Sequence, residues 1–237
     1  IDKVAGGDVS SPYNKAVLKF GANSIIDDSV IISITPLRKE ELAQVISPGI
    51  EPIGAFFKLQ PIGIKINQDN PGILYVRYTN KELRDAGIDP AQMTLYKIGN
   101  AGELVPISTS RVQDPWLTGL YDPDNPESIA TISVPVYSFS YYFALPTLKV
   151  PVFNITENKV GTEVVSINGS TDPNLVVEIF VHSSSQGTVQ ADASGNFVFE
   201  NIKLVEGSNT ITGKATKLIT SNTSYSSLES SPTAVFL

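Results

Sequence analysis

Short runs of β-branched and aromatic residues, separated by turn residues, recur along the whole chain and limit it to folds built from strands. In the C-terminal part they come about every 8–12 residues, which is the spacing of a β-sandwich. Turns between them carry Asp, Pro, Asn and Gly, as in Asp172-Pro173-Asn174 and Ser194-Gly195. We therefore predict an all-β fold. The expected C-terminal strands are 163–169, 175–181, 188–192, 196–200, 210–216 and one near 234–237.

The N-terminal part has the same strand character with two short interruptions. Strands are expected over 30–34, 73–79, 129–134 and 139–144, the first bounded by Pro36. Good helix formers over 37–45 and 80–87 predict helices of one or two turns. The second of these has Asn80 as its expected N-cap and Gly87 as its expected C-cap.

A proline-containing seam divides the chain. Pro146 and Pro151 each remove an amide donor and fix φ, so no regular element is expected to continue across them. Eight of the nine tyrosines come before residue 147, whereas the part after it is rich in Ser, Thr, Asn and Val. We predict two tandem β-sandwich domains, residues 1–147 and residues 148–237.

The composition excludes several kinds of chemistry. The 237 residues contain no Cys and one His, so zinc–thiolate, iron–sulfur, thiol and disulfide sites are ruled out. The net charge of −7 argues against nucleic acid, because phosphate binding needs clustered Lys and Arg. No run of about 18 apolar residues is present, so no membrane span is expected. A chain without Cys suits an extracellular bacterial protein, in which a free thiol would be oxidised.

Four ordered segments after the seam carry a resemblance to a known family. Through them, residues 148–237 resemble the bacterial immunoglobulin-like (Big-type) domain that repeats in modular surface proteins. The resemblance implies an immunoglobulin-like sandwich and no particular ligand. Many members have a turn where this chain has Lys217-Leu218-Ile219. The four segments are Val165-Ser166-Ile167-Asn168-Gly169-Ser170-Thr171-Asp172-Pro173, Val177-Glu178-Ile179-Phe180-Val181, Ala191-Asp192-Ala193-Ser194-Gly195-Asn196-Phe197 and Glu206-Gly207-Ser208-Asn209-Thr210-Ile211-Thr212-Gly213-Lys214-Ala215-Thr216.

A second resemblance covers residues 14–145, which are similar to the ZU5-type β-domain of bacterial surface proteins. It implies a first sandwich closed by an aromatic strand, and it places Trp116-Leu117 in a strand. The segments that carry it are Val30–Pro36, Phe57–Ile66, Leu74–Leu83, Ala86–Asp89, Leu95–Lys97 and Phe139–Leu145.

Some ZU5 relatives cleave themselves before the Ser of a His-Phe-Ser sequence. The matching positions here are Ser138, Phe139 and Ser140, so Ser138 stands where the relatives have the His that would act as base. A hydroxyl without a base is a poor nucleophile, and we expect the chain to stay intact. The single histidine, His182, follows a strand and is expected to be exposed at its end, not part of a catalytic triad.

One acidic segment could hold a cation. Asp122, Asp124 and Glu127 concentrate carboxylate oxygens, the ligands that calcium prefers. Two prolines lie among them and the spacing lacks the full calcium-loop pattern, so an Asp-Pro turn is the alternative. Asp27 and Asp28, together with Asp89, form a weaker candidate.

Two further surface features are compatible with sugars. Tyr13, Tyr137, Tyr141 and Tyr142 could form a stacking face, although alternation places one of the last two in the core. Glycosylation patterns start at Asn154, Asn168 and Asn222, a number expected by chance in a chain rich in Ser, Thr and Asn.

These observations predict a non-catalytic structural module of an extracellular, cell-surface protein, serving as a stalk, a spacer or a subunit of a surface assembly. Its partners would be neighbouring domains of a longer chain or other surface proteins. No cofactor is expected apart from the calcium alternative. A carbohydrate- or protein-binding adhesion module is the second reading, and an accessory domain of a secreted enzyme is the third. Ile1 in place of Met suggests a processed product or an excised piece of a longer chain.

Overall fold

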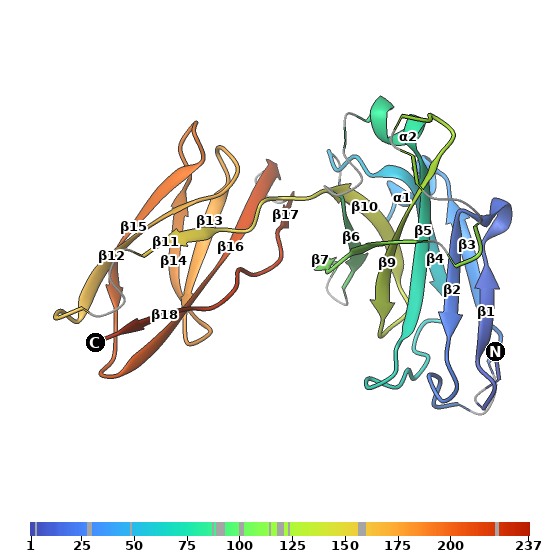
Figure 1. Ribbon diagram of the computed structural model, residues 1–237, viewed down its shortest axis with the longest axis horizontal. Coiled ribbons are helices and arrows are strands. Elements are labelled where there is room, and N and C mark those ends of the chain that lie inside the picture. Colours follow the sequence, from blue (N-terminus) through green and yellow to red (C-terminus); the bar gives the residue numbers. More distant parts are fainter. Residues whose placement is uncertain are drawn as a thin grey trace. The chain divides into compact units, whose positions relative to one another are not determined.

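The computed structural model describes residues 1–2, 4–27, 30–47, 49–86, 88, 93–99, 102–113, 115–117, 121–122, 124–155, 160–220 and 223–237. The chain divides into two compact units, Ile1–Pro146 and Thr147–Leu237. Each unit consists of two antiparallel sheets, which confirms the all-β prediction (Figure 1). Among the described residues, no helix is long and apolar enough to cross a membrane.

Two five-stranded sheets make up the first unit. In spatial order, one contains β1 (Gly7–Ser10), β2 (Ala16–Phe20), β5 (Gly72–Thr79), β9 (Ile129–Val136) and β8 (Ser110–Val112). The other contains β3 (Ser33–Leu37), β4 (Ile53–Gln60), β10 (Tyr141–Pro146), β6 (Met93–Ile98) and β7 (Leu104–Ile107). The short helical elements are the 3₁₀ turn η1 (Pro12–Asn14), α1 (Lys39–Leu42) and α2 (Asn80–Asp85).

The core of the first unit follows from the alternation of side chains along its strands. In β5, Leu74, Val76 and Tyr78 are all buried and belong to one apolar cluster. Phe57 of β4 and Tyr142 of β10 bring side chains of the other sheet into the same cluster. Successive side chains of a strand point to opposite faces, so the residues between these inward positions are left for the outer face.

The second unit has a smaller pair of sheets and a separate core. One sheet is β11 (Val152–Asn154), β12 (Val164–Ser170) and β15 (Asn196–Lys203). The other is β14 (Ser184–Gln190), β13 (Val176–Val181), β16 (Ser208–Thr220) and β17 (Thr223–Ser226), and β18 (Thr233–Phe236) also pairs with β16. The core includes Ile167, Val177, Ile179, Phe197 and Ile211.

Gly169 of β12 lets two aromatic rings meet in that core. Phe153 and Phe197 pack edge to face with ring centroids 6.1 Å apart. A Cβ atom on Gly169 would lie 2.2 Å from the Phe197 ring, so a larger residue would have to displace the ring. The glycine is therefore a packing requirement of this strand and not a sign of flexibility.

Two serines bridge the gap between β17 and β18 along the edge of β16. The Ser227 amide donates to the Ala215 carbonyl at 2.7 Å, and the Ser227 hydroxyl accepts from the Ala215 amide at 3.0 Å. Ser230 makes the same pair of bonds with Gly213, at 2.9 and 3.0 Å. Hydroxyls thus continue the ladder where the strand pairing stops, which leaves these buried amides satisfied.

Several predicted elements differ from the structure at their ends. Pro36 lies inside β3, where the expected strand should have stopped, because β3 is an edge strand that pairs only with β4. The expected strand over 139–144 begins later, at Tyr141. Residues 217–219, where many members of the resembled family have a turn, lie inside β16, which runs through to Thr220 and pairs with β17.

The two predicted helices are shorter than expected. The first is reduced to α1, because Leu37 belongs to β3 and residues 43–45 form a turn. The second begins at Asn80, the residue expected to be its N-cap. Thr79, not Asn80, is the N-cap and accepts from the Glu82 amide. Gly87, the expected C-cap, lies outside the described residues.

We expect Ser227→Ala to destabilise the second unit by about 1–2 kcal/mol, because the buried Ala215 amide loses its acceptor. The Ala215 amide should then exchange with deuterium faster than in the wild type, as measured by NMR. Ser231→Ala, a change at an exposed neighbouring serine, is the matched control. Equal exchange in the two variants would show that the hydroxyl does not complete the ladder.

Candidate functional site

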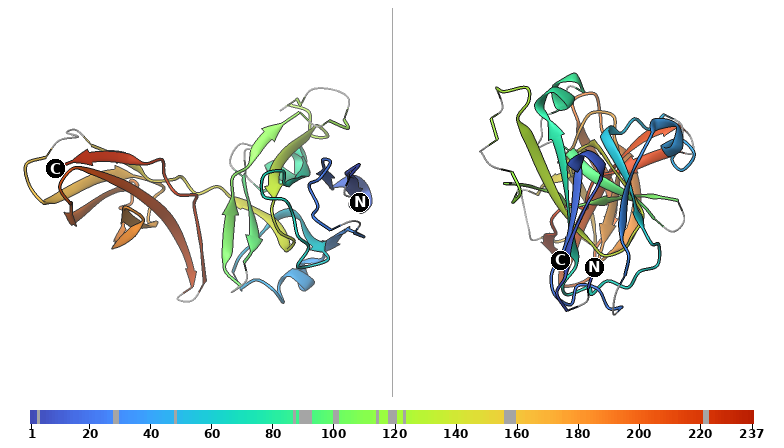
Figure 2. Two further views of the ribbon diagram at one scale, coloured as in Figure 1. Left: turned by 90° about the horizontal axis from the view of Figure 1, so that it is seen from below. Right: turned by 90° about the vertical axis from the view of Figure 1, so that its right-hand side faces the viewer.

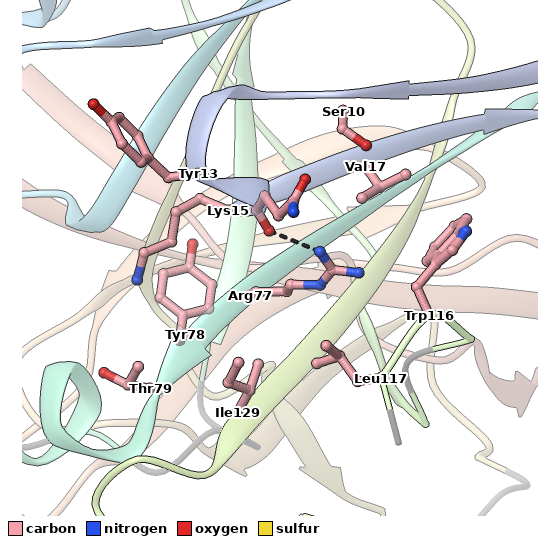
Figure 3. Close-up of a pocket in the computed structure, with 11 residues that line it drawn as sticks. Ser10, Tyr13, Lys15, Val17, Arg77, Tyr78, Thr79, Trp116, Leu117 and Ile129 are labelled. Carbon is pink, nitrogen blue, oxygen red and sulfur yellow. Dashed lines mark hydrogen bonds between the residues drawn. The ribbon is translucent and has the colours of Figure 1, made fainter. Parts of the chain in front are cut away.

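A hollow of about 390 Å³ opens on the first unit where β1 ends, β2 begins and β5 ends (Figure 3). Turns and four strands, β1, β2, β5 and β9, contribute to it, so its walls come from distant parts of the sequence. We call it the Tyr13–Trp116 hollow. Its described lining consists of Ser10, Tyr13, Asn14, Lys15, Val17, Arg77, Tyr78, Thr79, Trp116, Leu117 and Ile129.

The turn that carries Tyr13 has an uncommon backbone. Tyr13 and Asn14 adopt φ values of 62° and 52°, a left-handed conformation that side chains other than glycine rarely take. The Tyr13 ring gains no packing in return, since it is 95% exposed. Each such residue costs about 1–3 kcal/mol and persists only where its surroundings enforce it.

Arg77 and Ser11 enforce that conformation. The Arg77 guanidinium donates to the Asn14 carbonyl at 2.8 Å, and the Arg77 amide donates to the Lys15 carbonyl at 2.9 Å (Figure 3). At the other end of the turn, the Ser11 hydroxyl accepts from the Ala16 amide at 2.9 Å. The turn is therefore fastened to the end of β5 and to the start of β2.

Trp116 stands on the opposite side of Arg77 from Tyr13 in Figure 3. It packs edge to face on Tyr75, with centroids 5.0 Å apart, and it remains 39% exposed. The Lys19 ammonium and the Arg77 guanidinium both lie 5.8 Å from its ring centroid. The indole is thus held in place by an aromatic ring and two cations while one part of it faces solvent.

Tyr78 is a buried wall residue with an unusual hydroxyl. Among the described residues, none forms a hydrogen bond with this hydroxyl. Burial raises the pKa of Tyr78 far above its usual range, and the Glu82 charge adds to the effect, so the phenol stays protonated. Gly54, with φ of 61°, leaves room for the ring, because its Cβ would lie 2.7 Å from it.

A small charged network closes the end of β5. The Lys15 ammonium donates to both Glu82 carboxylate oxygens, at 2.7 and 2.8 Å, and the Thr79 amide donates to Glu82 at 2.8 Å. Partial burial of Glu82 acts to raise its pKa. The bonds from Lys15 and Thr79 outweigh burial and hold the pKa of this carboxyl below its usual range.

The predicted calcium segment is organised around an asparagine from outside it. Asn80 is 2% exposed, and its side-chain amide donates to the Asp122 and Asn125 carbonyls, each at 2.6 Å. The Asn80 side-chain oxygen accepts from the Tyr121 hydroxyl. An amide group therefore occupies the centre of this loop and takes the backbone carbonyls that a cation would need.

The three carboxylates of that segment do not converge. Asp122 accepts from the Asp124 amide at 2.9 Å in a local turn, and Asp122, Asp124 and Glu127 are all exposed. No group of three acidic, His or Cys residues that could hold a metal occurs in the described part of the chain. The geometry therefore favours the turn. In the weaker candidate, Asp28 and Asp89 lie outside the described residues.

Ser138 and Ser140 line a second hollow, of about 540 Å³, together with Lys97. The Lys97 ammonium donates to the Ser138 hydroxyl at 3.0 Å. The Ser140 hydroxyl donates to the Ile98 carbonyl at 2.6 Å, an acceptor that cannot take up a proton as a general base. This arrangement is consistent with an intact chain, which stays a prediction.

The remaining predicted residues are scattered. Tyr142 is buried while Tyr141 lies in the outer layer beneath Lys58, as alternation predicted.

His182 is exposed in the two-residue turn between β13 and β14. Asn154 and Asn168 face each other across β11 and β12, and Asn222 is outside the described residues. Of the four tyrosines, only Tyr13 lines the hollow of Figure 3.

Trp116, Arg77 and Lys15 were not expected as site residues. Trp116 was placed in a strand, whereas it lies in a turn after β8. The one signal in the sequence that points to this place is that Trp116 is the single Trp of a β-rich chain.

A scan against known protein families found no match, and a search of curated proteins found no similar sequence. The two family resemblances thus stay predictions.

We expect the stability of the first unit to fall as the pH drops below about 4.5, partly through Glu82. A carboxyl whose folded pKa is lowered stabilises the fold above its unfolded value of 4.5, and this stabilisation is lost as pH falls through the folded pKa. Glu82→Gln should destabilise the unit at pH 7 and flatten its pH dependence. Urea unfolding followed by fluorescence of the single Trp measures this. Glu40→Gln, at an exposed glutamate, should leave the profile unchanged.

Asn80→Ala should destabilise the first unit by about 2–3 kcal/mol, because two carbonyls and the Tyr121 hydroxyl lose a buried partner. The same urea titration measures the loss. The matched control is Asn70→Ala, which removes a bond to the Ala22 carbonyl from an exposed side chain and should cost less than half as much. Similar losses in both variants would argue against a central role of Asn80.

Proposed function

We propose that the chain is a non-catalytic structural module of an extracellular surface protein: a stalk, a spacer or a subunit of a surface assembly. Its partners would be neighbouring domains of a longer chain or other surface proteins. The observation that carries this proposal is the way the second unit holds its first and last strands. The absence of Cys and the two family resemblances support the extracellular location.

The first and last strands of the second unit run in the same direction. In Figures 1 and 2 the chain enters this unit at one end, and β11 and β18 both point to the other end, where Leu237 lies. A pull on the two ends of the unit therefore acts along both strands. Hydrogen bonds of an antiparallel ladder are perpendicular to the strands, so such a pull loads them together and not one after another.

Both loaded strands are fastened beyond their ladders. Before β11, the Lys149 amide donates to the Asp172 carboxylate at 2.8 Å, and the Lys149 carbonyl accepts from the Thr171 hydroxyl. After β18, Leu237 and Gly207 exchange two backbone bonds, at 3.0 and 3.2 Å. The places where tension would enter the unit are thus the places with additional bonds.

Force spectroscopy on the full chain tests this function. Pulled by its two ends, the second unit should unfold in a single high-force event. Because the chain has no Cys, a pulling handle can be placed at Ser194→Cys, in the turn beside Thr171. A pull between this handle and the N-terminal side of the unit peels β11 from β12, so the rupture force should be several-fold lower.

Thr171→Val supplies a matched variant for the end-to-end pull, since it removes only the hydroxyl that donates to Lys149. It should lower the end-to-end rupture force and leave the peeling force nearly unchanged. Equal rupture forces in the two pulling directions would overturn the mechanical role. A low end-to-end rupture force would also argue against the mechanical role. It would favour a binding module or an accessory domain instead, and it would not contradict the β-sandwich fold.

A further inference from the structure

One edge of β12 in the second unit is left open where β11 ends (Figure 1). β11 pairs only with residues 168–170 of β12, although β12 begins at Val164. On its other side, β12 pairs with β15 from Val164 to Ser170. Among the described residues, 164–167 therefore have a paired strand on one side only.

The alternation of backbone bonds shows which groups of β12 face this open side. In an antiparallel sheet, successive residues of a strand turn their N–H and C=O groups to opposite neighbours. The Glu163 carbonyl accepts from a residue just after β15 at 2.8 Å, and the Thr171 amide donates to a residue just before β15 at 2.9 Å. The odd-numbered residues between them thus bond toward β15. Val164 and Ser166 turn their backbone groups to the open side.

Three of these four backbone groups lack a partner in the described part of the chain. The fourth, the Val164 carbonyl, accepts from the Thr162 hydroxyl at 3.0 Å. No described residue forms a hydrogen bond with the Val164 amide or with the amide and carbonyl of Ser166. An unpaired edge of this kind is a template on which another chain can add a strand.

A hollow of about 360 Å³ lies along the open edge. Its described lining includes Asn154, the last residue of β11, together with Val164 and Ser166, and it contains no charged side chain. Toward the core it is lined by Val165 and Val235, which are part of the apolar cluster or pack against it. A strand placed here would therefore turn an apolar side chain inward, opposite Val165, and polar side chains outward, opposite Ser166 and Val164.

We propose that this opening binds an extended, uncharged segment of another surface protein as an additional strand beside β12. The residue opposite Ser166 would exchange two backbone bonds with it, and the next residue would bury its side chain against Val165. A charged side chain is excluded from the inward position, because the lining offers it no counter-charge. The site goes beyond the proposed function, which concerns load, and takes from it only the partner's identity as a surface protein.

Titration of the full chain with the peptide acetyl-Ser-Thr-Val-Thr-Ser-amide tests the proposal. Its two Thr residues would bond to β12, and its Val would point inward. NMR should show a saturable shift of the Ser166 amide signal and slower exchange of this amide with deuterium, because the N–H gains an acceptor. Replacing the peptide's Val by Asp should remove the effect.

Two N-methylated forms of this peptide are the matched pair. A methyl group on the nitrogen of the first Thr removes a donor that faces β12, so binding should weaken at least about fivefold. A methyl group on the Val nitrogen lies at the outer edge of the added strand and should leave the affinity unchanged. The two forms have the same side chains, so the difference between them reports on the backbone bonds alone.

Three results would overturn the proposal: no shift of the Ser166 amide with millimolar peptide, equal affinity of the two N-methylated forms, or an Asp peptide that binds as tightly as the parent. The rupture forces are measured without peptide. The binding site and the mechanical role can therefore fail independently.

Discussion

The first unit depends on the two-sided use of β5, the central strand of its sheet. Inward-facing Leu74, Val76 and Tyr78 help to fill the core, and the strand is paired along its length with β9 and over residues 73–76 with β2. Arg77 lies on the outer face and clamps the turn that carries Tyr13. Directly after the strand, Thr79 caps α2. The alternation that builds the core therefore also positions the hollow, because a strand that is fixed on one face fixes the side chains on the other.

Short polar side chains complete the structure where strands stop. After β5 ends, the Asn80 side chain makes three hydrogen bonds to the loop around Asp122. Between β17 and β18, the Ser227 and Ser230 hydroxyls accept from amides of β16 in place of a paired strand. Each is buried and has partners, as a low-dielectric interior requires. This also explains why an acidic sequence becomes a turn: its carbonyls point inward to an amide donor, and its carboxylates are left in solvent.

Local patterns predicted the elements whose causes are local. The strand over 73–79 follows a Pro-Gly turn, and the one over 175–181 alternates and follows an Asp-Pro-Asn turn, so both are close to β5 and β13. The prediction that Pro36 ends a strand is wrong, because the missing amide of Pro36 is harmless in β3, which lies at the edge of its sheet, and only the tertiary structure reveals this position. The hollow was missed for a similar reason. Its walls come from separated segments near residues 13, 77 and 116, and no spacing along the chain reveals that they meet.

The hollow is built largely on the strands of the first unit. The lining residues that belong to the ladders of β1, β2, β5 and β9 are Ser10, Val17, Arg77, Tyr78, Thr79 and Ile129. The other described lining residues lie in the turns around Tyr13 and Trp116. The strained turn and the exposed rings of Tyr13 and Trp116 contribute little to the sandwich, and the turn costs it free energy. A scaffold held by ladders elsewhere can carry such a cost at one end of a sheet. The same turn in a marginal single-sheet fold would relax to an unstrained backbone.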